Sequence, residues 1–283
     1  MIISTKKTKV LELPVLGLGT YRIGGDHERD LHNDDDGQIQ SIRKALNAGI
    51  KHIDTAESYA AGHAEMLIGK AIADFDRKDL FITTKVSRRH HHYKDVLESA
   101  QASLARLGIP YLDLYLLHAP HPEIPFRETF KAMNELVEKG TVRFIGVSNF
   151  TAVQLEQAKQ YSQYPITCNQ IHYSLSARDY ERDGTLEYCR ANGILVVAYR
   201  AMGDEGTPAV GWSLLEEMAK KYRKTAKQIA LRWVIQQPNV VGLAKMIQPQ
   251  HLQENLDALT WELASEDMER LTDDFPIGVT INR

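Results

Sequence analysis

The segment Leu112-Asp113-Leu114-Tyr115-Leu116-Leu117-His118 is a short apolar run that ends on a polar side chain. A continuous apolar run is typical of a strand that is covered on both faces, as in parallel sheets flanked by helices. Runs of this kind recur along the whole chain. We predict eight strands, at Val15–Gly19, His52–Ile53, Leu80–Thr84, Leu112–Leu117, Phe144–Val147, Thr167–Ile171, Ile194–Ala198 and Val240–Leu243.

Segments with helical spacing lie between the predicted strands. In one of them the apolar residues recur at the positions of a single buried helix face, Ala64, Leu67, Ile68, Ala71 and Ile72. We also expect Thr225 to cap one helix and a last helix to begin after Ser265. Strands that alternate with helices throughout a chain are typical of parallel α/β folds. Eight such units predict a (β/α)8 TIM barrel.

The chain has 283 residues and no linker rich in Pro, Gly or Ser. We therefore predict a single barrel domain over residues 1–283. A β-hairpin is expected before the first barrel strand, with strands at Ile2–Ser4 and Val10–Leu13 and a turn at Thr5–Thr8. This hairpin is expected to cap the N-terminal end of the barrel, its bottom.

The composition is that of an ordinary globular protein, with 43% hydrophobic and 25% charged residues. The 34 basic and 37 acidic side chains give a net charge of -3, which predicts neither a nucleic-acid partner nor a membrane partner. Cys168 and Cys189 lack a metal-binding spacing, so we expect no metal site and no disulfide framework. The N-terminal residues lack the apolar core of a secretory signal, and a cytoplasmic location is expected. The sequence does not give an oligomeric state, and we take a monomer as the default.

Polar side chains stand at the ends of the predicted strands or directly after them. In a TIM barrel the active site is built from residues at the carboxyl ends of the strands. An Asp, a Lys and a His on three consecutive strands would be costly to bury unless they pair with one another. The strand-end residues are Thr20, Asp54, Lys85, His118, Ser148, Asn149, Gln170, Tyr199 and Lys245.

Four of the polar residues can carry acid–base chemistry. An ammonium group beside a tyrosine lowers the pKa of the phenol, and a carboxylate keeps the lysine charged. Lys85 and Asp54 are therefore expected to make Tyr59 a usable proton donor. His118 is expected to hold a carbonyl oxygen beside the phenol by donating a hydrogen bond. The pattern predicts a site that protonates an oxygen atom of a small-molecule substrate.

Motifs along most of the chain resemble those of the aldo-keto reductases and occur in the order found in that family. They lie between about residue 15 and about residue 260. They include Gly17-Leu18-Gly19-Thr20, Asp54-Thr55-Ala56 with Tyr59, Thr84-Lys85, Leu112–His118, Gly146-Val147-Ser148-Asn149-Phe150, Asn169-Gln170, Val197-Ala198-Tyr199 and Glu254-Asn255. The resemblance implies hydride transfer from a nicotinamide cofactor to an aldehyde or ketone, with Tyr59 as the general acid.

The resemblance also implies roles for individual residues. The implied catalytic tetrad is Asp54, Tyr59, Lys85 and His118. The residues implied at the nicotinamide end of the cofactor are Ser148, Asn149, Gln170 and the stacking Tyr199, and Gly19 and Thr20 are further expected cofactor-binding residues. The residues implied at the adenosine end are Arg200, Lys245, Met246, His251, Glu254 and Asn255. The substrate pocket is expected to include Tyr21, Tyr59, Ser87 and His118.

Two positions depart from the family pattern near the expected 2′-phosphate site. Met246 stands where a serine is usual, and His251 stands where an arginine is usual. Histidine offers fewer donors than arginine and is mostly neutral at pH 7, so the phosphate contact should be weaker. Lys245 and Arg200 still supply positive charge. We expect NADP(H) as the cofactor, with NAD(H) or dual use left open.

Two other functions are left open by the sequence. The chain could be a regulatory module that binds the cofactor with little turnover, or Lys85 could form a Schiff base as in barrel aldolases. Two charged segments have ordinary interpretations. Asp34-Asp35-Asp36 is expected to start a helix. Arg88–His92 is expected to be a solvated loop, and it favours an anionic substrate if it contacts one.

Overall fold

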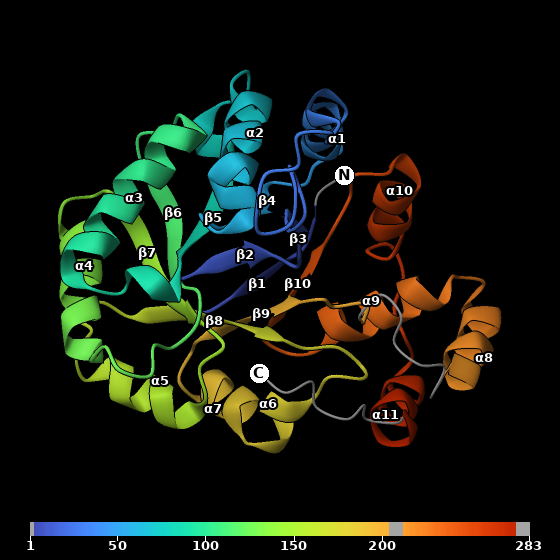
Figure 1. The fold of residues 1–283 in the computed structure, drawn as a ribbon. Helices are drawn as coiled ribbons and strands as arrows, with labels where there is room; N and C mark the ends of the chain where they lie inside the picture. The colour runs from blue at the N-terminus through green and yellow to red at the C-terminus, as the bar shows by residue number, and fades with distance from the viewer. Residues whose placement is uncertain (1–2, 204–211, 276–283) are drawn as a thin grey trace.

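The computed structural model describes residues 3–203 and 212–275, and within them eight parallel strands close into a barrel (Figure 1). The order around the barrel is β10-β3-β4-β5-β6-β7-β8-β9. The predicted (β/α)8 barrel is confirmed. The strands are β3 (Leu16–Gly19), β4 (His52–Asp54), β5 (Phe81–Val86), β6 (Leu112–Leu117), β7 (Val142–Ser148), β8 (Ile166–His172), β9 (Leu195–Tyr199) and β10 (Val240–Ala244).

Helices surround the strands (Figure 1). Within the described ranges, no helix is long and apolar enough to cross a membrane. The helices are α1 (Asp35–Asn47), α2 (His63–Ile72), α3 (Tyr93–Leu107), α4 (Phe126–Glu138), α5 (Ala152–Lys159), α6 (Asp179–Arg182), α7 (Thr185–Ala191), α8 (Trp212–Tyr222), α9 (Ala226–Gln236), α10 (Pro249–Asp257) and α11 (Ser265–Asp274).

Three helices begin where the sequence predicts. The side chain of Asp34 accepts a hydrogen bond from the backbone N–H of Gly37 and caps α1, so the acidic run does start a helix. Thr225 caps α9 in a reciprocal arrangement with Gln228. Helix α11 begins at Ser265, within one residue of the prediction.

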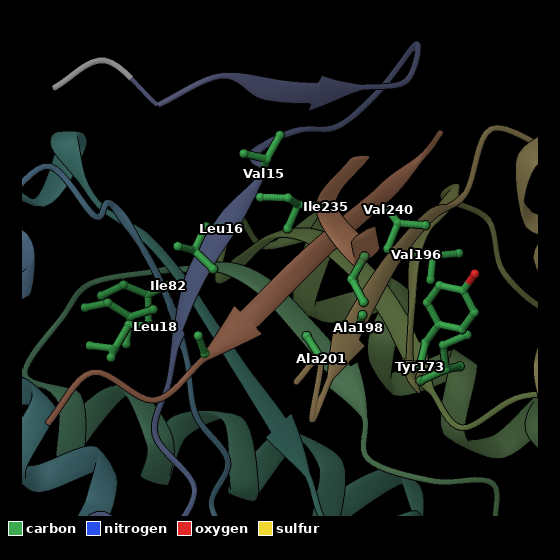
Figure 2. Close-up of a cluster of buried hydrophobic side chains, with 14 of the residues drawn as sticks. Val15, Leu16, Leu18, Ile82, Tyr173, Val196, Ala198, Ala201, Ile235 and Val240 are labelled. Atoms are coloured by element: carbon green, nitrogen blue, oxygen red, sulfur yellow. The ribbon is translucent and has the colours of Figure 1, made fainter. Parts of the chain in front are cut away.

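The side chains of the strands divide between the inside of the barrel and the layer of helices around it, because successive residues point to opposite faces. Leu16, Ile82 and Val196 pack in a large apolar cluster with helix residues (Figure 2). A second cluster fills the inside of the barrel with Leu114, Leu116, Cys168, Leu195, Val197, Val241 and Leu243. The site at the carboxyl ends of the strands therefore lies above a packed apolar core.

The predicted N-terminal hairpin is present and lies at the bottom of the barrel (Figure 1). Its strands are β1 (Thr5–Lys7) and β2 (Glu12–Pro14), and Leu11 and Leu13 pack into the inner apolar cluster. The predicted strand boundaries are wrong. Residues 5–7 are strand where a turn was predicted, and the turn lies at residues 8–11, where Thr8 bonds to Leu11. Burial of the two leucines sets this register; Ile2 lies outside the described residues.

Gly17 on β3 has no side chain and so leaves space for a buried histidine below the site. His52 is buried on β4, two residues before Asp54, and its Nε2 lies 3.1 Å from Thr83 Oγ1. A Cβ atom at Gly17 would lie only 2.5 Å from Nδ1 of His52. At Gly19, nearer the site, the closest atom to such a Cβ would be at 3.7 Å. The first glycine of the Gly17-Leu18-Gly19 motif is therefore a packing requirement.

Candidate active site

Lys85 lies at the centre of a polar cluster at the carboxyl ends of the strands. Its side chain is fully buried, and its Nζ donates to Asp54 Oδ1 at 2.6 Å and to the backbone oxygen of Thr55 at 2.7 Å. The same Nζ donates to Tyr59 Oη at 3.3 Å. The ammonium group thus has a partner for each of its three N–H bonds. The structure brings together the three residues that the sequence predicts to act as one group.

Asp54 is held through both its side chain and its backbone. Its Oδ2 accepts a hydrogen bond from Gln170 Nε2 at 2.7 Å, opposite the bond from Lys85. Its backbone oxygen accepts from the N–H of Thr20 at 3.1 Å and from Thr20 Oγ1 at 2.8 Å. Gly19 is paired with Asp54 in the parallel register of β3 and β4. Thr20, a predicted cofactor residue, therefore uses its hydroxyl to fix the position of the carboxylate.

Tyr59 begins a 3-10 turn over Tyr59–Gly62. Ala60 and Ala61 both have positive φ angles, 50° and 51°, which residues with a Cβ rarely adopt. Their N–H groups donate to the backbone oxygens of Asp26 at 2.7 Å and His27 at 2.8 Å. These bonds hold the strained turn against the loop that follows β3. Strain of this kind concentrates at functional sites, and here it fixes the backbone next to the phenol.

Burial and charge act in opposite directions on the two proton carriers. Burial lowers the pKa of Lys85, but Asp54 and Tyr59 raise it and the net shift is upward, so the side chain stays an ammonium. Burial raises the pKa of Tyr59 and outweighs the opposing effect of Lys85. The predicted lowering of the Tyr59 pKa is therefore wrong, because the buried phenolate would lose its hydration. Tyr59 keeps its proton at neutral pH and holds it ready for transfer.

His118 lies beside the phenol, directly after β6. Its ring meets the ring of Tyr59 edge to face, with the centroids 5.7 Å apart. Its backbone is fixed by a bond from its N–H to Val86 and by one from Asn149 Nδ2 to its oxygen. Burial, followed by the charge of Lys85, lowers the pKa of His118 to about 3, so the imidazole is neutral at physiological pH. A neutral imidazole beside a protonated phenol can hold and protonate a carbonyl oxygen.

Ser148, Asn149 and Gln170 form a linked set at the ends of β7 and β8. Ser148 Oγ donates to the backbone oxygen of Gln170 at 2.8 Å and accepts from Asn149 Nδ2 at 3.0 Å. Asn149 has a φ angle of 61°, and its Oδ1 accepts from Tyr199 Oη at 2.9 Å. The ring of Tyr199 stacks on that of His172, with the centroids 5.5 Å apart. Groups that both donate and accept, beside an aromatic ring, fit the carboxamide and ring of a nicotinamide.

The residues predicted for the adenosine end lie around the start of α10. Lys245 is exposed directly after β10, and its backbone oxygen accepts from Asn255 Nδ2 at 3.3 Å. His251 is half-buried in the first turn of α10, and Glu254 follows one turn later. A helix N-terminus with a lysine and a histidine nearby suits a negatively charged ligand. This arrangement fits the phosphate-bearing end of a nicotinamide cofactor.

The side chains of the other two predicted cofactor residues point in different directions. Met246 is buried in the apolar cluster around the barrel, so its side chain does not face the surface at α10. Arg200 is exposed after β9 and has a φ angle of 54°. From position 246, the backbone is therefore the part of the residue that can approach a cofactor.

The structure shows the contacts of Tyr21 and Ser87, the two remaining residues predicted for the substrate pocket. The ring of Tyr21 packs against that of Tyr59 at 5.4 Å between centroids, and its Oη donates to Asp26. The hydroxyl of Ser87 caps the short turn that follows β5 by accepting from the N–H of Arg89. Its own N–H donates to Glu57 Oε1 at 2.6 Å. Ser87 thus orders the loop beside the site.

The segment Arg88–His92 is largely exposed, as the sequence predicts, apart from one residue. His90 and His92 are exposed and lie within hydrogen-bond distance of Glu57 and Glu128, at 2.9 Å and 3.0 Å. His91 is buried, and burial lowers its pKa to about 4. The loop is therefore anchored by its histidines and leaves its two arginines exposed.

A family model described as the aldo/keto reductase family matches residues 15–207 and 211–273 of the chain. The chain belongs to the aldo-keto reductase family. It is 31% identical to methylglyoxal reductase YeaE of Escherichia coli, over 94% of this chain and 92% of that protein. A thermostable aldo-keto reductase crystallised with the inhibitor epalrestat superimposes with a TM-score of 0.92 at 44% identity, covering 95% of this chain and 99% of that one.

A solved complex supports the cofactor class of this aldo-keto reductase. An aldo-keto reductase of Klebsiella pneumoniae, crystallised with NADPH, superimposes with a TM-score of 0.86 at 30% identity. The alignment covers 98% of this chain and 96% of that one. The chain is accordingly a nicotinamide-dependent oxidoreductase, as the sequence predicts.

Three residues of the reductase site escaped the sequence reasoning. Glu57 bridges the Tyr59 loop and the Ser87 loop, a pairing across 30 residues for which the sequence carries no signal. Ser58 Oγ lies 3.3 Å from Nδ1 of His118. His172 follows Gln170 by two residues on β8, and the two-residue repeat of strand side chains could have placed it on the same face.

The buried histidines predict an acid-sensitive reductase fold. Burial lowers the pKa of His52 and of His91 from 6.5 to about 4, so the unfolded chain binds more protons than the folded one between these values. The free energy of unfolding should therefore fall as the pH is lowered from about 6.5 toward 4. Each histidine can contribute up to about 2 kcal/mol between pH 7 and pH 5. Urea unfolding at the two pH values measures the difference.

Matched variants identify the source of this pH dependence. His91→Gln should reduce the difference in unfolding free energy between pH 7 and pH 5, because one buried titrating group is lost. His32→Gln, at an exposed position, is the control and should leave the difference as in the wild type. Equal unfolding free energies at both pH values in the wild type would contradict the prediction.

Proposed function

We propose that the chain reduces the carbonyl group of small aldehydes and ketones with NADP(H), using Tyr59 as the proton donor and His118 as the group that orients the carbonyl. The observation that carries this proposal is the buried ammonium of Lys85, which bonds at once to Asp54 and to Tyr59. A lysine in this position stabilises the phenolate that remains after proton transfer. An assembly of this kind is suited to protonating an oxygen that is gaining negative charge.

The chain's own residues account for the proton half of the reaction. A bound reduced nicotinamide supplies the hydride to the carbonyl carbon. His118 donates a hydrogen bond that places the carbonyl oxygen near Tyr59 Oη, and the phenol gives its proton to that oxygen. Lys85 then faces a phenolate, and Asp54 keeps the lysine charged throughout. The reverse reaction uses the phenolate as a base that takes the proton of an alcohol.

Residues at or near the ends of β7, β8 and β9 would hold the nicotinamide end of the cofactor. Ser148 and Asn149 would bind its carboxamide, and Tyr199 would stack on its ring. Gln170 gives its Nε2 proton to Asp54, so its Oε1 is the atom suited to accept from the carboxamide N–H. Gln170 would in this way connect the cofactor to the carboxylate of the proton-donating group. Lys245 and His251 would face the phosphate of the adenosine end.

The structure favours carbonyl reduction over the Schiff-base chemistry that the sequence left open. A lysine that attacks a carbonyl must lose its proton, which a lowered pKa assists. Burial lowers the pKa of Lys85, but Asp54 and Tyr59 shift it upward overall, and all three of its N–H bonds are used. Borohydride trapping in the presence of a carbonyl substrate should therefore give no covalent adduct at Lys85.

The substrate class is proposed from a relative. Methylglyoxal reductase of Escherichia coli matches nearly the whole chain, which supports small aldehydes with a neighbouring carbonyl group as the first compounds to assay. NADPH consumption measured beside NADH consumption, across aldehydes, ketones and sugars, gives both preferences. Tight NADPH binding with no turnover of any carbonyl would support the regulatory alternative instead.

We further infer a single catalytic domain over residues 1–283 that works as a monomer in the cytoplasm. The matched family model runs through most of the chain without a second unit. Cys168 and Cys189 are free thiols, and both are buried. Free thiols suit a reducing compartment.

Tyr59→Phe tests the proton donor. The variant removes one hydroxyl and little shape, so NADPH binding should be retained while kcat falls by about 10²- to 10⁴-fold, the usual contribution of general acid catalysis. Steady-state kinetics and cofactor titration by protein fluorescence measure the two effects separately. A variant with full activity would overturn the assignment.

His251→Arg tests the adenosine end. The planar guanidinium should add charge-assisted hydrogen bonds to a 2′-phosphate, worth about 1.5 to 3 kcal/mol, and so raise the NADPH/NADH affinity ratio by about tenfold or more. NADH lacks the phosphate, so its Kd should hardly change. Fluorescence quenching gives both constants for both proteins. Equal changes for the two cofactors would place His251 away from the ribose.

A further inference from the structure

The imidazole of His118 has one proton to share between two nitrogens. Burial holds its pKa at about 3, so the ring is neutral at any pH at which the enzyme would work. In a neutral imidazole one nitrogen donates a hydrogen bond and the other accepts one. His118 can therefore donate to a substrate only if the nitrogen that faces the substrate carries the proton. A hydrogen bond to the other ring nitrogen is needed to favour one of the two tautomers.

The hydroxyl of Ser58 is the group that can favour one tautomer of His118. Its Oγ lies 3.3 Å from Nδ1 of His118, and the described residues give this hydroxyl no second hydrogen-bond partner. Ser58 is half-buried and lies directly before Tyr59 in the chain. Its hydroxyl therefore connects the turn that carries the proton donor with the ring that orients the substrate.

The hydroxyl of Ser58 does not cap the 3-10 turn that follows it, although Ser58 is at the N-cap position. Ser58 is the N-cap residue of the 3-10 turn, and a serine there commonly accepts hydrogen bonds from the next N–H groups. In this structure it makes no such bond. The N–H groups of Ala60 and Ala61 donate instead to the backbone oxygens of Asp26 and His27. The loop after β3 thus takes over the capping and leaves the serine hydroxyl free to face His118.

We propose that Ser58 is a positioning residue, whose hydroxyl donates to Nδ1 of His118 and so keeps the ring proton on Nε2, the nitrogen left for the substrate. The proposal rests on the proposed function, in which His118 orients the carbonyl. With Nδ1 occupied as an acceptor, Nε2–H is the donor. If Nδ1 carried the proton and donated to Ser58, Nε2 would present a lone pair to the carbonyl oxygen and repel it.

The first experiment reads the tautomer directly. Long-range ¹H–¹⁵N spectra of the full-length enzyme, labelled with ¹⁵N-histidine, distinguish protonated from unprotonated ring nitrogens at pH 7. The His118 signals are assigned by their loss in His118→Asn. The expected result is a protonated Nε2 and an unprotonated Nδ1. A proton on Nδ1 would overturn the proposal.

Variants at position 58 connect the tautomer with turnover. Ser58→Ala should give His118 nitrogen shifts averaged between the two tautomers and a kcat lowered by about 3- to 10-fold, the factor expected for one neutral hydrogen bond. Ser58→Thr keeps the hydroxyl and should restore both the shifts and kcat to within about twofold, well inside the effect of that bond. The cofactor Kd should be the same in all three proteins. Wild-type shifts and kcat in Ser58→Ala would contradict the proposal.

A second serine–histidine pair gives a matched control. Ser99 Oγ lies 3.3 Å from Nδ1 of His90, the same distance as in the Ser58 pair, but His90 is half-exposed, its Nδ1 is also 2.9 Å from Glu57 Oε1, and it has no role in the proposed proton transfer. Ser99→Ala should leave kcat and the His118 shifts unchanged. The nitrogen shifts also separate this proposal from the proposed function, because they report on Ser58 even if the wild type reduces no carbonyl in the panel. Loss of kcat in Ser99→Ala equal to that in Ser58→Ala would show a general packing effect and overturn the assignment.

Discussion

A fully buried ammonium group is the constraint on which the rest of the site depends. Removing a lysine from water is costly, and the cost is offset only where a counter-charge and further hydrogen bonds replace the lost hydration. Asp54 supplies the charge at 2.6 Å, while Thr55 and Tyr59 supply the other acceptors. The phenol oxygen of Tyr59 therefore replaces one of the water molecules that would hydrate the ammonium group of Lys85 in solution. Chemistry and stability use the same contacts, and a change in one partner affects both.

The fold supplies what this ion pair needs. Three different strands bring the partners together, with Asp54 on β4, Lys85 on β5 and Gln170 on β8. The parallel register aligns the ends of these strands at one edge of the barrel. Below them lies the apolar interior of the barrel, which the N-terminal hairpin closes, so water is excluded from beneath the charges. Two consecutive left-handed residues, Ala60 and Ala61, then turn the chain between Tyr59, whose phenol contacts Lys85, and helix α2.

Much of this arrangement could be predicted from the sequence, because each apolar strand ends on a polar residue and the barrel places those ends together. The clustering of Asp54, Lys85 and His118 follows from that rule alone. The pKa of Tyr59 could not be predicted, since it depends on the balance between burial and the charge of Lys85, and burial has no signature in a single residue. The hairpin register likewise depended on which leucines fit the barrel floor.

Hydrogen bonds between segments far apart in the chain also could not be predicted from the sequence. The hydroxyl of Thr20 donates to the backbone oxygen of Asp54, a contact between positions 34 residues apart that the sequence does not indicate. Ser58 has the residue type and position of a helix cap, and only the path of the loop after β3 shows that its hydroxyl faces His118. Residue type indicates which bonds a side chain can make, and the tertiary structure decides which of them it does make.

The claim that Lys85 tunes the proton carrier is tested most directly by the pH dependence of alcohol oxidation. In this direction the phenolate of Tyr59 acts as the base, so the rate should rise with pH through the apparent pKa of the phenol. Lys85→Met should lower the rate and move this apparent pKa upward, because burial then acts without the opposing ammonium. Lys94→Met, at an exposed position on α3, serves as the control. An apparent pKa and a rate in Lys85→Met equal to those of the wild type would contradict the account.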